Sequence, residues 1–194
     1  MDFEITVPKG VGARIDVAKG DVRVDGVAGT DLHVARGDVQ IAGLDGALQA
    51  DVISGDLEIR GVAGAALDII NGDVVLTHAT GPIAVTTKSG DVSLSQARST
   101  DVRIRTLSGD VAVDLVELAQ GTVSVETVSG DIKLAVPSDG RATIEASTRS
   151  GQISTGLPLT EQTTGFRSLR GVLNGPGADV RLQATSGDVR VKGR

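Results

Sequence analysis

Eight aspartates follow a glycine at regular intervals along the chain, and they are the residues best placed to do chemistry together. They are Asp21, Asp38, Asp56, Asp73, Asp91, Asp110, Asp131 and Asp188. If the intervals correspond to stacked repeats, the carboxylates form a ladder with neighbours about 5 Å apart. Carboxylates this close repel one another unless they are protonated or share a cation. Because clustered carboxylate oxygens suit calcium, the ladder is a candidate metal site, with Asp56, Asp73, Asp91, Asp110 and Asp131 as its candidate ligands.

A structural role for these aspartates is the favoured interpretation. An aspartate beside a glycine commonly accepts hydrogen bonds from backbone amides of its own turn, and the glycine adopts a dihedral angle that other residues resist. A serine precedes several of the glycines, as in Ser129-Gly130-Asp131, and can support the same turn. The denser glycine-aspartate nonapeptide pattern of calcium-loaded β-rolls is missing. We therefore expect no cofactor, with calcium as the open alternative.

The remaining polar residues form no catalytic or metal-binding motif. The two histidines, His33 and His78, have no spaced histidine or cysteine partner for zinc, and no Gly-x-Ser-x-Gly occurs that could present a serine nucleophile. The tripeptide Arg36-Gly37-Asp38 has an integrin-type sequence, but it falls at the same repeat position as the other glycine-aspartate pairs. A hydrolase that uses paired aspartates is the least favoured alternative, because sugar-cleaving solenoids line their clefts with aromatic side chains and this chain has 2 Phe and no Trp or Tyr. We predict a protein without enzymatic activity and without catalytic residues.

The glycines before the aspartates mark the repeat itself. The predicted structural corners are Gly20, Gly37, Gly55, Gly72, Gly90, Gly109, Gly130, Gly151 and Gly187. By subtraction, neighbouring corners are 17 residues apart at Gly20 and Gly37 and 21 apart at Gly109 and Gly130. The 36-residue gap before Gly187 is about twice as long, and Gly171 is interpreted as a tenth, degenerate corner that divides it.

Apolar residues alternate with polar ones on both sides of each corner. Around Gly130 the alternating positions are Val123, Val125 and Thr127 before it and Ile132 and Leu134 after it. A period of two residues indicates strands with one buried and one wet face. One repeat is too small to bury its apolar face alone, whereas stacked parallel copies share a continuous interior. The sequence predicts an all-β fold, a single-domain β-solenoid of stacked coils of about 17–21 residues with two main strands per coil. An antiparallel meander of hairpins is the alternative.

Composition limits the size of the fold and the kinds of partner. A chain of 194 residues fits one domain, residues 1–194, and its core must consist of valine, leucine, isoleucine and alanine because aromatic residues make up 1%. The stretch 156–177 is polar and rich in turn formers, so we expect an irregular coil or loop there. The net charge of -6 comes from interspersed charges without a basic patch, so nucleic acid is not an expected partner. No apolar run approaches the roughly 20 residues of a membrane helix, so no membrane span is expected.

The two ends of such a stack expose strand edges that can pair with other chains. Phe3, Ile5 and Val7 alternate ahead of Pro8 and predict a first strand. Lys192 and Arg194 flank the last strand, where they are expected to protect the opposite edge. End-to-end self-association is therefore an interaction that the sequence leaves open.

The recurring Ser-Gly-Asp corner, followed by valine or isoleucine, resembles the bacterial putative-adhesin family of β-strand-repeat domains of unknown function. The opening Ile5-Thr6-Val7-Pro8-Lys9-Gly10 is similar to the usual entry strand of that family. Residues 171–177 are similar to its glycine-rich irregular coil ahead of a final Ser-Gly-Asp strand. The resemblance covers nearly the whole chain, and it implies a β-solenoid-like fold and a non-enzymatic role tied to the bacterial cell envelope.

We therefore predict a non-enzymatic binding or scaffolding module that presents a flat polar surface to a protein or glycan partner. A self-assembling structural solenoid resembling bactofilin-type scaffolds is the alternative. The opening Met1-Asp2-Phe3-Glu4 lacks the basic and apolar regions of a signal peptide. The sequence as given therefore favours the cytoplasm, whereas the family resemblance favours the cell envelope if a leader was removed.

Overall fold

The computed structural model describes residues 12–99, 101–118, 120–165 and 167–194, and strands dominate these ranges. The predicted first strand at Phe3, Ile5 and Val7 lies outside the described residues. The strands are β1 (Gly12–Val17), β2 (Val22–Asp25), β3 (Gly29–Arg36), β4 (Val39–Ser54), β5 (Leu57–Asn71), β6 (Val74–Ala79), β7 (Ile83–Ser89), β8 (Val92–Ala97), β9 (Asp101–Ser108), β10 (Val111–Leu115), β11 (Thr122–Ser129), β12 (Ile132–Val136), β13 (Ala142–Ser150), β14 (Ile153–Thr155), β15 (Thr160–Gly165), β16 (Ser168–Leu173), β17 (Ala178–Ser186) and β18 (Val189–Gly193).

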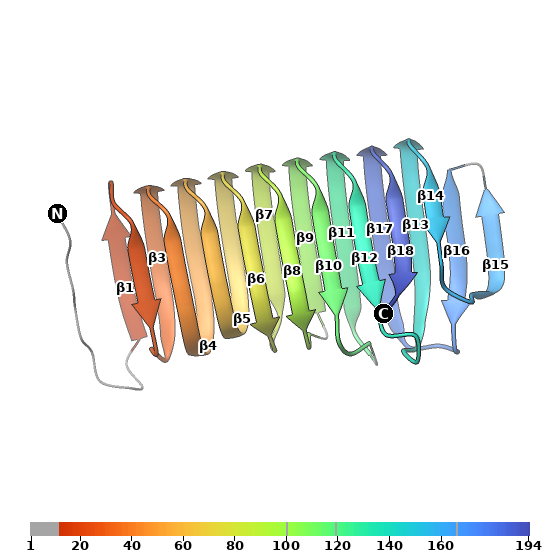
Figure 1. The fold of residues 1–194 in the computed structure, drawn as a ribbon, viewed down its shortest axis with the longest axis horizontal. Coiled ribbons are helices and arrows are strands. Elements are labelled where there is room, and N and C mark those ends of the chain that lie inside the picture. Colours follow the sequence, from red (N-terminus) through yellow and green to blue (C-terminus); the bar gives the residue numbers. More distant parts are fainter. Residues whose placement is uncertain (1–11, 100, 119, 166) are drawn as a thin grey trace.

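The strands stack as coils of a β-solenoid, which confirms the predicted fold class (Figure 1). Strands that lead into a corner form one wall, the approach wall, made of β1, β3, residues 47–54 of β4, residues 64–71 of β5, β7, β9, β11, β17 and β13. Strands that leave a corner form the exit wall, made of β2, residues 39–44 of β4, residues 57–62 of β5, β6, β8, β10, β12, β18 and β14. Pairing within each wall is parallel and in register, so the alternative of an antiparallel meander is wrong.

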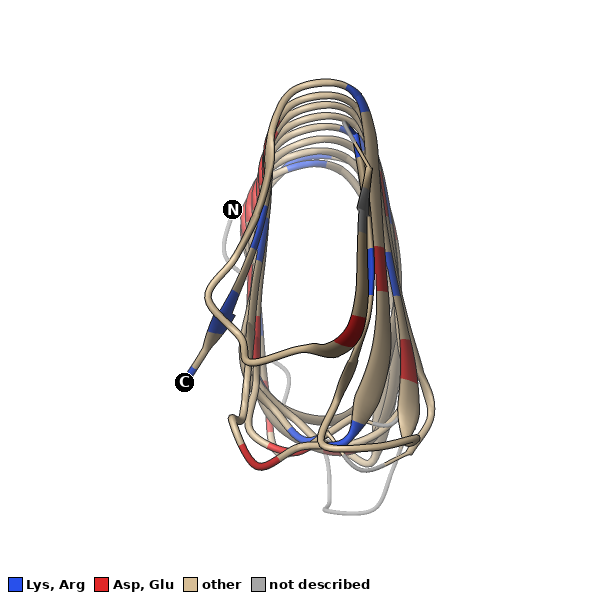
Figure 2. Ribbon diagram, turned by 90° about the vertical axis from the view of Figure 1, so that its right-hand side faces the viewer, with Lys and Arg blue, Asp and Glu red and all other residues tan. Residues whose placement is uncertain are grey.

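The interior is the continuous apolar layer that the period of two predicted. Seen along the stack, the coils superimpose as a closed oval with charged residues distributed around its outside (Figure 2). In β11 the inward residues Val123 and Val125 are 1% and 0% exposed, whereas Val128 beside the corner is 44% exposed. Valine, leucine and isoleucine fill this layer because β-branched and aliphatic side chains pack well on a pleated surface.

Buried threonines occupy the last inward position before several corners, namely Thr87, Thr106, Thr127 and Thr148. Their hydrogen bonding differs, which leads to a prediction for stability. Thr87 is 2% exposed and its Oγ1 has no hydrogen-bond partner among the described residues, whereas the Oγ1 of Thr148 donates to the carbonyl oxygen of Gly187 at 3.0 Å. A buried hydroxyl without a partner costs about 1–3 kcal/mol. We expect Thr87→Val to raise the free energy of unfolding by about 1 kcal/mol and Thr148→Val to lower it by a similar amount. Urea denaturation measures both, and equal effects of the two substitutions would contradict the assignment.

The last coil of the sequence is not at the end of the stack. Strand β17 pairs with β11 on one side and with β13 on the other, and β18 likewise pairs with both β12 and β14. Figure 1 shows the dark-blue β17 and β18 between the green β11 and β12 and the cyan β13 and β14. The expectation that Lys192 and Arg194 protect an open edge is therefore wrong, because their strand has a neighbour on each side. Spacing along the chain gives the length of a coil but not its place in the stack.

An antiparallel hairpin occupies much of the stretch 156–177, for which the sequence predicted an irregular coil or loop. Strands β15 and β16 pair with each other, and β16 pairs with the outer edge of β13. Gly171 lies inside β16 opposite Ile144 and is not among the glycines with positive φ, so its interpretation as a tenth corner is wrong. A Cβ at Gly171 would lie 2.9 Å from the Cβ of Leu159. Glycine is needed at this position because the Leu159 side chain leaves no room for a Cβ, and not because the chain turns there.

Candidate functional site

The corners are the most regular part of the structure, and each of the nine predicted corner glycines has a φ between +137° and +154°. These glycines also touch the neighbouring corner. A Cβ built on Gly130 would lie 2.0 Å from the carbonyl oxygen of Gly109, and Gly187 approaches Gly130 in the same way. Gly20, the first corner of the stack, is different because its Cβ would meet only a Val17 methyl at 4.0 Å. Stacking and backbone conformation therefore both require glycine at all the later corners.

The corner aspartates form a hydrogen-bonded ladder that runs from coil to coil. The Oδ1 of Asp110 accepts a hydrogen bond from the backbone amide of Asp131 at 2.8 Å, and the Oδ1 of Asp131 accepts one from the amide of Asp188 at 2.8 Å. The same bond links the earlier steps of the stack at 2.7–3.1 Å. From the sequence, each aspartate was expected to accept hydrogen bonds within its own corner. The structure corrects this, because the acceptor lies one coil before the donor.

The ladder explains why Gln152 replaces aspartate at one corner. The amide of Gln152 donates to the Oδ1 of Asp188 at 2.9 Å, so Gln152 occupies the last step. No later corner amide in the described stack needs a carboxylate from this position. The described residues contain no group of three or more His, Asp or Glu side chains placed to hold a metal ion. The geometry gives these aspartates a structural role in pairing adjacent coils.

Because each ladder carboxylate accepts one hydrogen bond from the next coil, removal of one carboxylate is expected to lower stability modestly. Asp131→Ala leaves the amide of Asp188 without its acceptor and is expected to lower the free energy of unfolding by about 1 kcal/mol. Asp139, an exposed aspartate in the turn after β12, serves as the control, and Asp139→Ala should change stability by less than about 0.5 kcal/mol. Chemical denaturation of both variants tests this. A gain in stability for Asp131→Ala would show that repulsion along the ladder outweighs its hydrogen bonds.

The two histidines lie on different walls, His33 on β3 of the approach wall and His78 on β6 of the exit wall. His33 on β3 has its Nδ1 2.9 Å from Asp51 Oδ2 and its Nε2 3.4 Å from Asp31 Oδ1, so the ring lies between two carboxylates on the approach wall. His78 is exposed near the end of β6, where its φ is 57°. Arg36-Gly37-Asp38 lies at an ordinary corner whose glycine stacks on Gly20. The ion pairs around His33 are half exposed and contribute little stability.

A broad depression of about 760 Å³ lies on the approach wall in the N-terminal half of the stack. Its lining residues are Asp16, Val17, Ala18, His33, Val34, Ala35, Asp51, Val52, Ile53, Asp68, Ile70 and Lys88. Asp51 and Asp68 are paired in register on neighbouring strands, an arrangement that places like charges side by side. Asp51 has His33 as its partner, whereas Asp68 has no ion pair among the described residues. The depression therefore combines an acidic column with an apolar border.

That border continues as a line of exposed apolar residues along the stack. Ile53, Leu107 and Val128 are 52%, 53% and 44% exposed. The residues that directly follow this line are paired from strand to strand, which places the line at one height. The pairs are Ser54–Asn71, Asn71–Ser89, Ser89–Ser108 and Ser108–Ser129. We call the residues Ile53, Ile70, Lys88, Leu107 and Val128 the rim line. The rim line was not predicted from the sequence, although an apolar residue directly before the corner serine breaks the alternation and is the signal that marks it.

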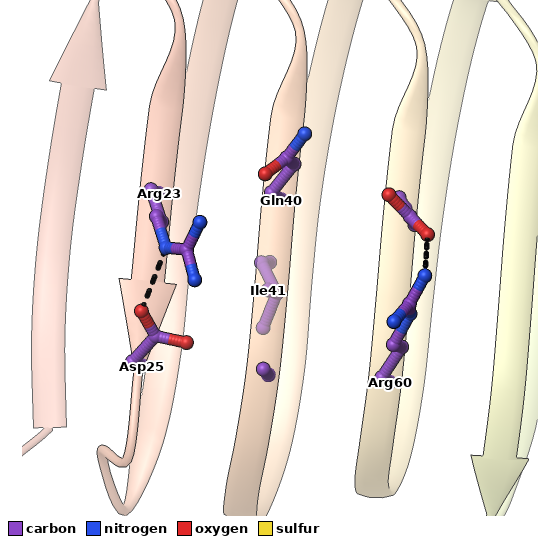
Figure 3. Close-up of a pocket in the computed structure, with 7 residues that line it drawn as sticks. Arg23, Asp25, Gln40, Ile41 and Arg60 are labelled. Carbon is purple, nitrogen blue, oxygen red and sulfur yellow. Dashed lines mark hydrogen bonds and ion pairs between the residues drawn. The ribbon is translucent and has the colours of Figure 1, made fainter.

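A smaller hollow of about 200 Å³ lies on the exit wall and is lined by charged pairs. Figure 3 shows Arg23 beside Asp25 on one strand and Arg60 on another. Arg60 forms its ion pair with Glu58 of its own strand. Arg23 Nε is 2.9 Å from Asp25 Oδ2, and both side chains are more than half exposed. The hollow places no unpaired charge beside an apolar surface, which distinguishes it from the depression on the approach wall.

Comparisons with known proteins identify one protein family and one distant structure. The Toastrack DUF4097 family model matches residues 3–120 and again residues 67–192. A crystal structure of a putative cell adhesion protein from Clostridium sporogenes aligns with a TM-score of 0.37 and 8% identity, covering 96% of this chain and 94% of that one. A search of curated proteins finds no match. No helix among the described residues has the length and apolar character needed to cross a membrane.

Proposed function

The chain belongs to the Toastrack DUF4097 family, whose model matches nearly all of it, and we propose that it is a non-enzymatic binding module whose approach wall docks a protein partner. The rim line is the observation that carries this proposal. Ile53, Leu107 and Val128 are among the four large apolar residues that stay exposed in the described structure, and they share one line of one wall. Aligned exposed apolar side chains are typical of protein interaction surfaces.

The charge beside the rim line indicates the character of the partner segment. Asp51 and Asp68 lie next to each other on the approach wall, and Ile53 and Ile70 follow them two residues later on the same strands. Like charges on adjacent strands destabilise a sheet, so a basic group that binds between them gains electrostatic attraction and relieves that repulsion. The proposed partner segment therefore carries aliphatic side chains opposite the rim line and a lysine or arginine opposite Asp68.

A protein fits this wall better than a glycan does. Sugar rings are commonly bound against aromatic side chains, and the chain has no Trp or Tyr. Its 2 Phe, Phe3 and Phe166, lie outside the described residues, so the described wall offers no Phe, Tyr or Trp ring to a sugar. Aliphatic contacts surrounded by charged residues are the usual composition of a protein–protein interface.

The test is an affinity capture from extracts of the source cell with matched variants of the full chain. The rim variant carries Ile53→Ser, Leu107→Ser and Val128→Ser. The control carries Val75→Ser, which changes the fourth exposed apolar residue, 41% exposed on the exit wall. A protein partner should bind the wild type and the control alike and lose at least about tenfold in affinity for the rim variant.

Two results would overturn the proposal. Equal capture by the rim variant and the control would show that the rim line does not carry binding. Specific binding to a glycan array, unchanged by the rim substitutions, would establish the glycan alternative instead. Asp68→Lys supplies a second measurement. Reversal of the unpaired charge should weaken the partner's binding, and the affinity of this variant should fall less steeply with added salt than the affinity of the wild type does.

A further inference from the structure

The two ends of the stack differ in how their strand edges are covered. At one end, β16 pairs with β13 in an antiparallel hairpin with β15. At the other end, β1 pairs only with β3 and β2 only with β4 among the described strands (Figure 1). Ile15 and Val17 in β1 are only partly buried, whereas their neighbours Leu32 and Val34 are 0% and 2% exposed. The N-terminal end of the described stack therefore has unpaired backbone groups and incompletely covered apolar side chains.

The charges on this first coil are self-complementary. On β1, Arg14 and Asp16 point outward on either side of Ile15. On β2, Arg23 and Asp25 flank Val24 in the same way. The other described coils do not have opposite charges around the central inward residue on both walls. The pattern is therefore specific to the coil at the open edge.

From this edge we infer that the N-terminal end is an interface for a second copy of the chain, which docks through a two-fold axis. A two-fold axis across the edge sets β1 antiparallel to β1 of the second copy. When the axis passes through Ile15, Arg14 lies opposite Asp16 of the second copy, and the reciprocal pair forms as well. Opposite charges at directly paired positions stabilise adjacent strands.

A single two-fold axis pairs the edge strands of both walls with their copies. Counted away from the corner at Gly20, the first and second inward residues are Val17 and Ile15 on the approach wall. On the exit wall they are Val22 and Val24. The two central residues therefore lie at the same height on opposite walls, and the axis that passes Ile15 also passes Val24. Arg23 then lies opposite Asp25 of the second copy. Pairing of β1 and β2 with their copies covers both open edges and the apolar end of the core.

The geometry favours a dimer over a filament. At the far end, β16 covers the edge of β13 on the approach wall, and its antiparallel pairing with β13 and β15 departs from the coil pattern. Association through the N-terminal ends alone closes after two copies, because a two-fold interface uses the same surface on both. This inference is independent of the proposed function, since the rim line and the N-terminal edge are different surfaces.

Sedimentation velocity of the full chain over a concentration series tests the interface. Two charge variants are designed to repel themselves: one carries Arg14→Asp and Arg23→Asp, and the other carries Asp16→Arg and Asp25→Arg. Each should dimerise at least about tenfold more weakly than the wild type. An equimolar mixture of the two variants should recover the dimer, because each then offers the charges that the other lacks. Arg103→Asp with Arg105→Asp on the middle of the approach wall is the control and should dimerise like the wild type.

Recovery in the mixture separates interface charge from any effect on folding, because a misfolded variant would not recover. A wild type that stays monomeric at all concentrations would overturn the inference and would favour coverage of the edge by the chain's own residues 1–11. A dimer that both charge variants retain would place the interface elsewhere. Species that keep growing with concentration would contradict closure at two copies.

Discussion

Replacing Gly130 by alanine is expected to lower the free energy of unfolding by about 2–6 kcal/mol, because two separate costs combine at this corner. The φ of Gly130 is +146°, a conformation that costs a residue with a side chain about 1–3 kcal/mol. The new Cβ would also lie 2.0 Å from the carbonyl oxygen of Gly109, so the two coils must separate or shift. Overpacking of this kind costs a further 1–3 kcal/mol or so. Urea denaturation followed by circular dichroism measures the sum.

Gly20 provides the matched control for that prediction. Its φ of +139° imposes the same type of backbone cost, but its Cβ would meet only a Val17 methyl at 4.0 Å. Gly20→Ala is therefore expected to cost only the conformational part, about 1–3 kcal/mol. The difference between the two variants isolates the contact between stacked corners. Equal losses at Gly20 and Gly130 would show that corner stacking contributes nothing beyond backbone conformation.

The corners were predictable because their chemistry is local. A positive φ and a close backbone approach both exclude side chains, so each corner leaves a glycine in the sequence at nearly constant spacing. The alternation around each glycine likewise predicted which residues are buried, as the 1% and 0% exposed Val123 and Val125 illustrate. These features depend on a few neighbouring residues and can therefore be predicted from the sequence alone.

The stacking order and the aspartate bonds were not predictable in the same way, because both depend on contacts between distant residues. The Oδ1 of Asp131 accepts a hydrogen bond from the amide of Asp188, which lies 57 residues later in the chain. Nothing near Asp131 distinguishes this partner from Gln152, the residue of the next corner in sequence. The replacement of aspartate at Gln152 was the available signal, since the last step of a ladder needs no further acceptor. The prediction of a corner at Gly171 was wrong for the converse reason, because a glycine required by the nearby Leu159 side chain has the same appearance in the sequence as a corner glycine.

The interior position of the last coil predicts a large effect at Leu182. Leu182 on β17 is 0% exposed, and its strand pairs with both β11 and β13. Leu182→Ala is therefore expected to lower the free energy of unfolding by about 2–5 kcal/mol, as for a leucine in a closely packed core. If the coils stacked in the order of the sequence, Leu182 would lie in the final coil with one side uncovered. The cost would then be much smaller, because the site could be filled by solvent.

Ile15 at the described edge of the stack is the matched control, since it occupies the same inward column in a coil that pairs on one side only. Measured at a concentration where the chain is monomeric, Ile15→Ala is expected to cost about half as much as Leu182→Ala, because partial exposure reduces both the transfer and the cavity contribution. Hydrogen exchange supplies the independent measurement. The amide of Val189 donates to the carbonyl oxygen of Gln152, and that of Ile132 donates to Asp188, so β18 is held from both sides. The amides of β18 should therefore exchange as slowly as those of β12, since interior strands open only with most of the fold. Rapid exchange of β18, as in a fraying terminal strand, would place the last coil at the end of the stack and contradict the insertion.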